Sequence, residues 1–345
     1  MIRTDRTLAD GRRIRYYDDG PEPRPRDRAD PRDLAPTAAV TDIRHDPLTG
    51  EPVVIAAHRQ DRTHKPAADH CPLCPGRPDA PGEIPEPHYD VVVFENRFPA
   101  FAGGQGRAEV VCFTDEHDTS FAELSPTRVR TVLDALADRT AELSGTDGVR
   151  QVFPFENRGE EIGVTLHHPH GQIYGYPFVP PRTARMLEHA RARLTTHGTH
   201  PLGDLLAAER ADGTRVVTRG RHWTAFVPPA ARWPVQVLIV PHRRVADLSE
   251  LTADERDDVA GVSLDVLRRC DALYDRPLPY VAGWHQAPAV GDREAAWLHL
   301  EVFSVRRAAD KLKYLAGSES GMAVWVNDVT PERIAENLRD TRPGR

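Results

Sequence analysis

The spacing of apolar residues predicts one long helix in each half of the chain. In residues 126–144, apolar side chains such as Val129, Val132, Leu133 and Leu136 recur every three or four positions, which places them on one helix face. A second segment, from residue 253 to about 273, has the same character. Each helix is therefore expected to bury one face against a sheet.

Short apolar runs predict strands on both sides of each helix. The order strand, strand, helix, strand, strand occurs twice, and the text around the helix starts is similar, FAELSPTRVRTVLDAL against DLSELTADERDDVAGVSL. Helix starts with Ser or Thr caps resemble one another in any case, but order and text together favour a duplication. We expect an α/β (α+β) fold with antiparallel sheets, each carrying a long helix. The expected strands are 52–57, 90–94, 109–113, 150–156, 165–176, 223–227, 236–240, 279–284 and 297–305.

The amino-terminal part has a different composition. Residues 1–40 are charged and proline-rich; the first twenty can form a hairpin, and residues 21–36 read as a mobile connector. The expected organisation is an amino-terminal extension at 1–40, a first half at 41–180 and a second half at 181–340.

Composition and charge exclude several classes of protein. No apolar stretch reaches about 18 residues and the first residues lack a signal-peptide core, so we expect no membrane contact and a cytoplasmic location. The formal net charge of -7 argues against general nucleic-acid binding. Four cysteines in 345 residues do not make a secreted disulfide framework.

Two of these cysteines indicate a metal site. Cys71 and Cys74 form a CPLC pair in a proline-rich loop, HCPLCPGRPDAPG. A redox pair would be expected to open a helix after a strand, so a metal site is favoured. A tetrahedral zinc site needs two more ligands from elsewhere, and His117 and His168 are the candidates. A reduced pair without metal is the alternative.

The most informative segment is His168-Pro-His170-Gly-Gln172. In a strand, alternation places His168, His170 and Gln172 on one face, and Gly171 is expected to let a ligand approach the backbone. A neutral imidazole nitrogen attacks phosphorus well and splits one displacement into two. A neighbouring glutamine can donate to a phosphoryl oxygen but cannot activate water as a base, which favours transfer over hydrolysis.

HPHGQI, preceded by FENRG, resembles the active-site signature of the galactose-1-phosphate uridylyltransferases, the transferase branch of the histidine-triad superfamily. DPLTGEPVVIAAHRQDR, CPLC, VVVFENRF, CFTDEHDTSFAEL, GWHQAP, HLEVF and KLKYLAGSE also resemble family blocks, in family order, over residues 42 to 338. The resemblance implies two fused histidine-triad-like halves. Histidine-triad hydrolases would have a third histidine where Gln172 stands.

The resemblance also implies a reaction and its residues. His170 would take UMP from UDP-glucose and pass it to galactose 1-phosphate, giving UDP-galactose and glucose 1-phosphate, with Gln172 as the phosphoryl donor. Proteins of this family assemble as homodimers in which both subunits contribute to each site, so the resemblance implies a homodimer. Substrate contacts are implied for Arg59, Arg62, Leu73, Asn96, Phe98, Asn157, Gly163, Thr165, Gln172 and Lys313.

Two metal sites are implied in the same way. The first is a structural zinc site, made of Cys71, Cys74, His117 and His168. The second, for zinc or iron, matches Glu188, His285, His299 and Glu301, although Glu301 replaces a histidine of the family and Glu188 lies two residues beyond the usual glutamate position. A buried hydrogen-bonded pair is the alternative for the second cluster.

Two other functions remain open from the sequence. The same fold could serve a nucleotidyltransferase or phosphorylase that uses ADP-sugars or dinucleoside polyphosphates. A non-catalytic zinc scaffold is the second alternative. Trp297 is expected to be a core aromatic residue, and His200 is expected to face solvent.

Overall fold

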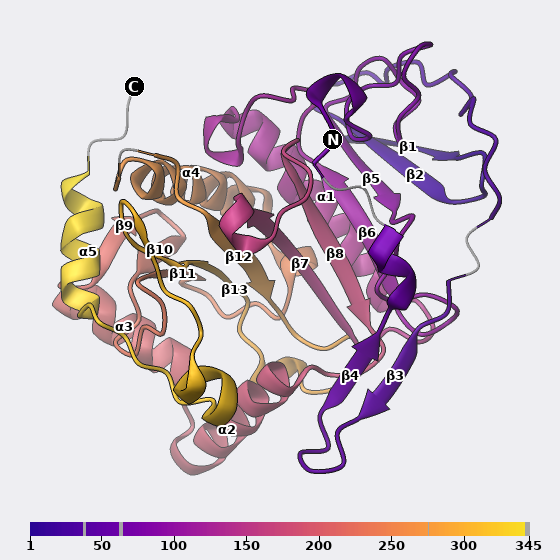
Figure 1. Cartoon of the computed structure of the whole chain (residues 1–345). Helices are drawn as coiled ribbons and strands as arrows, with labels where there is room; N and C mark the ends of the chain where they lie inside the picture. Colours follow the sequence, from indigo (N-terminus) through magenta and orange to yellow (C-terminus); the bar gives the residue numbers. More distant parts are fainter. Residues whose placement is uncertain (37–38, 62–64, 275, 342–345) are drawn as a thin grey trace.

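The computed structural model describes residues 1–36, 39–61, 65–274 and 276–341, and most of its strands form one antiparallel sheet (Figure 1). In spatial order the sheet contains β1 (Ile2–Thr7), β2 (Arg13–Asp18), β5 (Val91–Glu95), β6 (Arg107–Cys112), β8 (His170–Tyr176), β7 (Gln151–Arg158), β12 (Tyr280–His285), β13 (His299–Ser304), β11 (Val235–Pro241), β10 (Trp223–Phe226) and β9 (Val216–Arg219).

The remaining elements connect or cover these strands. The helices are α1 (Pro126–Ser144), α2 (Pro181–His197), α3 (Pro201–Asp212), α4 (Ala253–Asp271) and α5 (Pro331–Asp340). Two small hairpins are β3 (Asp42–His45) with β4 (Pro52–Ile55), and β14 (Arg306–Ala308) with β15 (Lys311–Leu312). None of the helices in the described ranges is both long and apolar enough to cross a bilayer.

The sheet contains the same unit twice. The order β5, β6, β8, β7 in the first half is mirrored by β10, β11, β13, β12 in the second, and the two units meet where β7 pairs with β12. The helices α1 and α4 occupy the same place in each unit, between the second and third strands along the chain. The predicted fold class is therefore confirmed, and the two predicted sheets are joined edge to edge.

The two faces of the sheet are covered differently. Because side chains alternate along a strand, Val91 and Val93 enter the large core beneath α1 and α4, whereas Val92 and Phe94 face the other way. In the first half, this other face packs against the loop that carries the two cysteines. In the second half it is covered by α2 and α3.

The expected amino-terminal hairpin is confirmed as β1 and β2, and β2 pairs with β5 to extend the sheet. Residues 21–36 have no helix or strand, yet they are anchored. Arg26 is 3% exposed and pairs with Asp18. Arg32 pairs with Asp30 at 2.8 Å and with Glu83 at 2.8 Å. These ion pairs fix a segment that its composition alone marks as a flexible connector.

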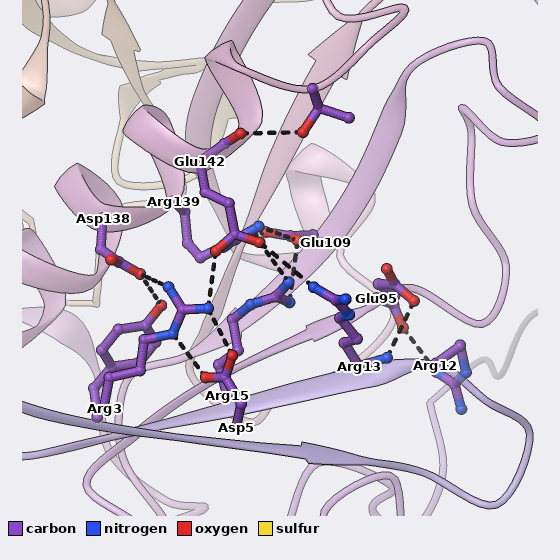
Figure 2. Close-up of polar contacts among 12 residues, drawn as sticks. Arg3, Asp5, Arg12, Arg13, Arg15, Glu95, Glu109, Asp138, Arg139 and Glu142 are labelled. Atoms are coloured by element: carbon purple, nitrogen blue, oxygen red, sulfur yellow. Dashed lines mark hydrogen bonds and ion pairs between the residues drawn. The ribbon is translucent and has the colours of Figure 1, made fainter.

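A network of ion pairs ties the hairpin to α1 (Figure 2). Glu142 accepts from Arg3 at 2.8 Å and from Arg15 at 2.9 Å. Arg139 is 1% exposed and forms two hydrogen bonds, of 2.9 and 2.8 Å, with Glu109. Burial by itself raises the pKa of Glu142, but the charges of Arg139 and Arg15 lower it to about 2. Removing one member leaves buried charges without a partner, which is costly.

This network predicts acid sensitivity. Since the folded pKa of Glu142, about 2, lies below its ordinary value of 4.5, its contribution to stability is present above pH 4.5 and is lost as the pH falls toward 2. We expect Glu142→Gln to lower the urea midpoint at pH 7 and to flatten its fall between pH 5 and 3. Glu51→Gln, at an exposed carboxylate, serves as the control. An unchanged acid limb in Glu142→Gln would contradict this account.

Candidate active site

His170 is the first residue of β8, and its side chain lies on the face of the sheet opposite α1. Along this strand Gly171 and Ile173 are buried toward the core, whereas His170 and Gln172 are partly exposed on the other face. The predicted strand from 165 starts only at His170, since Pro169 before it has no N–H for the ladder. Alternation therefore places His170 and Gln172 together, as predicted.

The tautomer of His170 is set by its backbone. Its Nδ1 lies 2.8 Å from the carbonyl oxygen of His168, which can only accept, so Nδ1 carries the proton. The unprotonated Nε2 is then the free ring nitrogen. Burial lowers the pKa of His170, which keeps the ring neutral near pH 7. A neutral imidazole with a fixed tautomer is suited to nucleophilic attack.

His170 and Gln172 line an open cleft of about 220 Å³. Arg59, in the short helix Ala57–Asp61, donates from Nη1 to the Tyr174 hydroxyl at 3.0 Å. Asn96 accepts from the backbone N–H of Phe98 at 2.8 Å, which fixes the turn after β5. Of the predicted substrate-binding residues, the cleft brings together Arg59, Leu73, Asn96, Phe98, Thr165 and Gln172. Arg62 lies outside the described residues.

A second hollow reaches His170 from the β7 side. Asn157 lines it, together with Glu156, whose carboxylate accepts from the Tyr280 hydroxyl at 2.9 Å. Burial raises the pKa of Glu156 to about 7. His170 therefore lines two neighbouring cavities.

Two predicted contact residues line neither cavity. Gly163 ends the short helix Glu160–Ile162 with a positive φ of 85°, which glycine adopts without strain. Lys313 pairs with Glu319 at 2.9 Å and is not among the residues that line either hollow. Within one chain, these residues are not brought to His170.

Gly171 has a different role from the one expected. A Cβ at this position would lie 2.8 Å from the Phe155 carbonyl oxygen and 2.9 Å from the Phe113 ring. These atoms belong to the sheet and the core side, so the glycine is needed for close packing beneath the strand rather than for ligand approach.

The Cys71, Cys74, His117 and His168 side chains meet, as predicted, with all four ligand atoms within 4.8 Å of one another. Cys74 Sγ lies 3.3 Å from His117 Nδ1 and 3.5 Å from His168 Nδ1. Burial and the neighbouring Cys71 raise the pKa of Cys74 to about 12, an effect that a bound cation reverses because it stabilises the thiolate. Two sulfur and two imidazole donors are a donor set suited to a metal ion.

The surroundings of His168 support this assignment. Its Nε2 donates to the Thr114 carbonyl oxygen at 2.8 Å, which leaves the Nδ1 lone pair directed at the cluster. The Tyr89 hydroxyl lies 2.9 Å from the same Nε2 and donates to the Leu73 carbonyl oxygen at 2.8 Å. Such outer contacts orient a metal-binding imidazole. Although alternation groups His168 with His170, His168 is fully buried among these partners.

The second predicted metal cluster does not assemble. His285, His299 and Glu301 lie together: the two rings stack at 4.9 Å, and His285 Nε2 lies 3.0 Å from Glu301. Glu188, however, is exposed on α2 and does not line their cavity.

Glu301 is already occupied by other donors. It accepts from Arg182 at 2.8 Å and from Gln236 at 2.6 Å. Burial alone would raise the pKa of Glu301, but the His285 hydrogen bond and the Arg182 charge lower it. Because a guanidinium already stands against this carboxylate, these residues do not fit a metal ion.

Sequence reasoning missed several residues around the cleft. Arg32 and Glu83 line it from the amino-terminal segment and the cysteine loop. Arg97 also lines it, with its guanidinium 5.6 Å from the Phe98 ring. Arg97 stands in the VVVFENRF block and could have been found there, whereas no periodicity or motif marks Arg32.

Comparison with known proteins gives a consistent result. Residues 101–180 and 187–342 match the two families described as galactose-1-phosphate uridyl transferase, N-terminal and C-terminal domain. A "Galactose-1-phosphate uridylyltransferase" of Streptomyces lividans is 46% identical, covering 99% of this chain and 98% of that protein. One of Thermotoga maritima is 34% identical, covering 87% and 98%. A solved "Structure of uridylyltransferase" superposes with a TM-score of 0.76 at 31% identity, covering 86% and 97%.

Proposed function

The chain belongs to the galactose-1-phosphate uridylyltransferase family, and we propose that it transfers UMP from UDP-glucose to galactose 1-phosphate through a covalent uridylyl group on His170. The relatives named above support the enzyme class. The covalent step is our inference from the geometry around His170.

In the first step, His170 Nε2 attacks the α-phosphorus of UDP-glucose. An N–P bond forms, the P–O bond to the β-phosphate breaks, and glucose 1-phosphate leaves. In the second step, a phosphate oxygen of galactose 1-phosphate attacks the same phosphorus, which gives UDP-galactose and frees Nε2. The Gln172 side-chain amide would donate to a non-bridging oxygen as negative charge develops there.

One observation carries this proposal. The Nδ1–H of His170 is held by the His168 carbonyl at 2.8 Å, and the ring opens on two cavities together with Gln172. The free Nε2 is thus a neutral nucleophile that adjoins space for a substrate phosphate.

The first cleft is suited to the nucleotide. Arg59 has no carboxylate at ion-pair distance among the described residues, so its charge is available to a phosphate. Leu73, Asn96 and Phe98 would surround the uridine, and Asn157 and Thr165 the phosphates. Arg62, Gly163 and Lys313 are proposed contacts by family resemblance, with Lys313 reaching the site from the second subunit of a homodimer.

We further propose zinc as the ion of the Cys71, Cys74, His117 and His168 cluster. Mixed thiolate and imidazole donors favour zinc, and four protein ligands leave no open position for catalysis. The ion would clamp the cysteine loop to the segment before His170. The cytoplasm, where thiols stay reduced, is the proposed compartment.

Incubation with UDP-glucose alone tests the covalent step. We expect intact-mass spectrometry to show one added uridylyl group, removed by mild acid as a phosphoramidate should be. ADP-glucose, the matched donor with another base, should leave the mass unchanged. An adenylyl adduct in place of the uridylyl one would move the activity to ADP-sugars, and no adduct with either donor would remove the covalent mechanism.

A further inference from the structure

The second half of the sheet has a cavity of its own, of about 310 Å³, between the sheet and the helices α2 and α3. His299 begins β13 as His170 begins β8, and both donate Nδ1–H to the carbonyl two residues earlier, at 2.9 Å to Trp297 and 2.8 Å to His168. This cavity is therefore the structural counterpart of the cleft at His170.

The counterpart lacks the features needed for transfer. His299 is 6% exposed, whereas His170 is partly exposed. Where Gln172 follows His170 by two residues, Glu301 follows His299, and a carboxylate paired with Arg182 has no hydrogen to donate to a phosphoryl oxygen. This cavity can therefore bind a ligand without reacting with it.

Its charge favours an anion. Arg182 and Glu301 neutralise each other at 2.8 Å, which leaves Arg232 as the remaining charged group of the lining. In the part of the chain that the structure describes, no carboxylate lies at ion-pair distance from the Arg232 guanidinium. Arg232 is exposed and its guanidinium lies 5.7 Å from the Trp325 ring centroid. Desolvation and the charge of Arg182 lower the pKa of Arg232 while Glu301 raises it, so a nearby anion would favour the charged guanidinium.

The amino-terminal end of α2 adds positive electrostatic potential to the cavity. Arg182 and Thr183, in the first turn of α2, line the cavity, and the α2 N-cap residue Pro180 offers no side-chain acceptor to their backbone N–H groups. His200, the N-cap residue of α3, lines it as well, but its Nδ1 accepts from the Leu202 N–H at 3.1 Å, so α3 is already capped. Helix N-termini carry a partial positive charge that attracts anions.

The rest of the wall is apolar and aromatic. Trp297 is only partly buried, in contrast to the core position expected for it, and its ring packs against His200 at a centroid distance of 5.2 Å. Helix α3 approaches this ring so closely that a Cβ at Gly203 would lie 2.5 Å from it, and the absence of a side chain at Gly203 makes this approach possible. The apolar lining is completed by Met186, Leu187, Leu202, Leu205 and Leu238.

We propose that this second cavity binds a nucleoside monophosphate, with the phosphate at Arg232 and the start of α2 and the base against Trp297. A free phosphate would leave the apolar wall without a partner, and a sugar phosphate offers too many hydroxyl groups for it. An aromatic anion satisfies both parts of the lining, and the volume is in the range of small-molecule sites.

Equilibrium dialysis with labelled UMP tests this site by its stoichiometry. We expect wild-type protein to bind two UMP molecules per chain, one in each cavity, and Arg232→Gln to bind one. Leu205→Glu, which places a carboxylate in the apolar wall, should likewise lose one. Arg191→Gln, on the same helix α2 but outside the cavity, should keep both.

The result separates this proposal from the one for His170. If the first cleft binds no UMP, wild type binds one molecule and Arg232→Gln none, and the second site still stands. Equal numbers of bound UMP molecules per chain in wild type, Arg232→Gln and Leu205→Glu would overturn the proposal of a second site.

Discussion

Replacing His170 by alanine is expected to reduce uridylyl transfer by at least about four orders of magnitude, because the substitution removes the nucleophile of a covalent reaction. The variant should keep its fold, since the His170 side chain is partly exposed and its described hydrogen bond is to the His168 carbonyl. We expect kcat to fall while UDP-glucose still binds in the cleft. Stopped assays of UDP-galactose formation, together with isothermal titration of UDP-glucose, measure the two quantities separately.

The control is another histidine of the same chain. His197, at the exposed end of α2, lies outside both cavities that meet at His170, and His197→Ala should transfer UMP at close to the wild-type rate. If His170→Ala retained transfer, a non-catalytic or differently centred protein would be the better description. Loss of binding together with loss of rate would indicate collapse of the cleft instead of loss of the nucleophile.

The elements that sequence reasoning found are those whose local pattern matches their packing. Helices α1 and α4 each bury a continuous apolar stripe beneath the sheet, so their periodicity is visible in the sequence and their starts are marked by caps at Ser125 and Thr252. The strands next to them are apolar runs with one face in the same core.

The elements that were missed cover the other face. Helix α2 buries only Leu187 and Ala190, and α3 only Leu206 and Glu209, so most of each helix surface is polar. Without a wide apolar stripe, the 3.6-residue period is weak. As a result the second cavity, which these two helices close, could not be derived from the sequence.

The site divides in the same way. His170, Gln172, His168 and the two cysteines were found because short motifs hold them in fixed spacing, and His117 was found through the family resemblance. Arg32 reaches the cleft from a segment without regular structure, which is fixed by the ion pair of Arg32 with Glu83, a residue distant in sequence. The ion pair between Glu301 and Arg182, which stands where a second metal site was predicted, was missed for the same reason. Long-range ion pairs leave no periodic signal.

Loss of the metal site should affect both stability and catalysis. In Cys74→Ala, we expect bound zinc to fall from one to none per chain and the melting temperature to fall by at least about 5 °C, because metal-binding free energy contributes directly to folding. Transfer should fall by about 10- to 100-fold even in the folded fraction. The reason is that the carbonyl of His168 holds His170 Nδ1–H, so freeing the His168 ring from the ion loosens the backbone that sets the nucleophile's tautomer.

Cys270→Ala is the matched control, since Cys270 is also buried but lies on α4, away from the cluster. It should lose some stability through the small cavity it creates, yet keep its zinc and its transfer rate per folded molecule. Metal analysis by mass spectrometry, thermal unfolding and steady-state kinetics on the three proteins separate these effects. Full activity in zinc-free Cys74→Ala would show that the cluster does not position His170. Unchanged zinc content would instead assign the ion to other ligands.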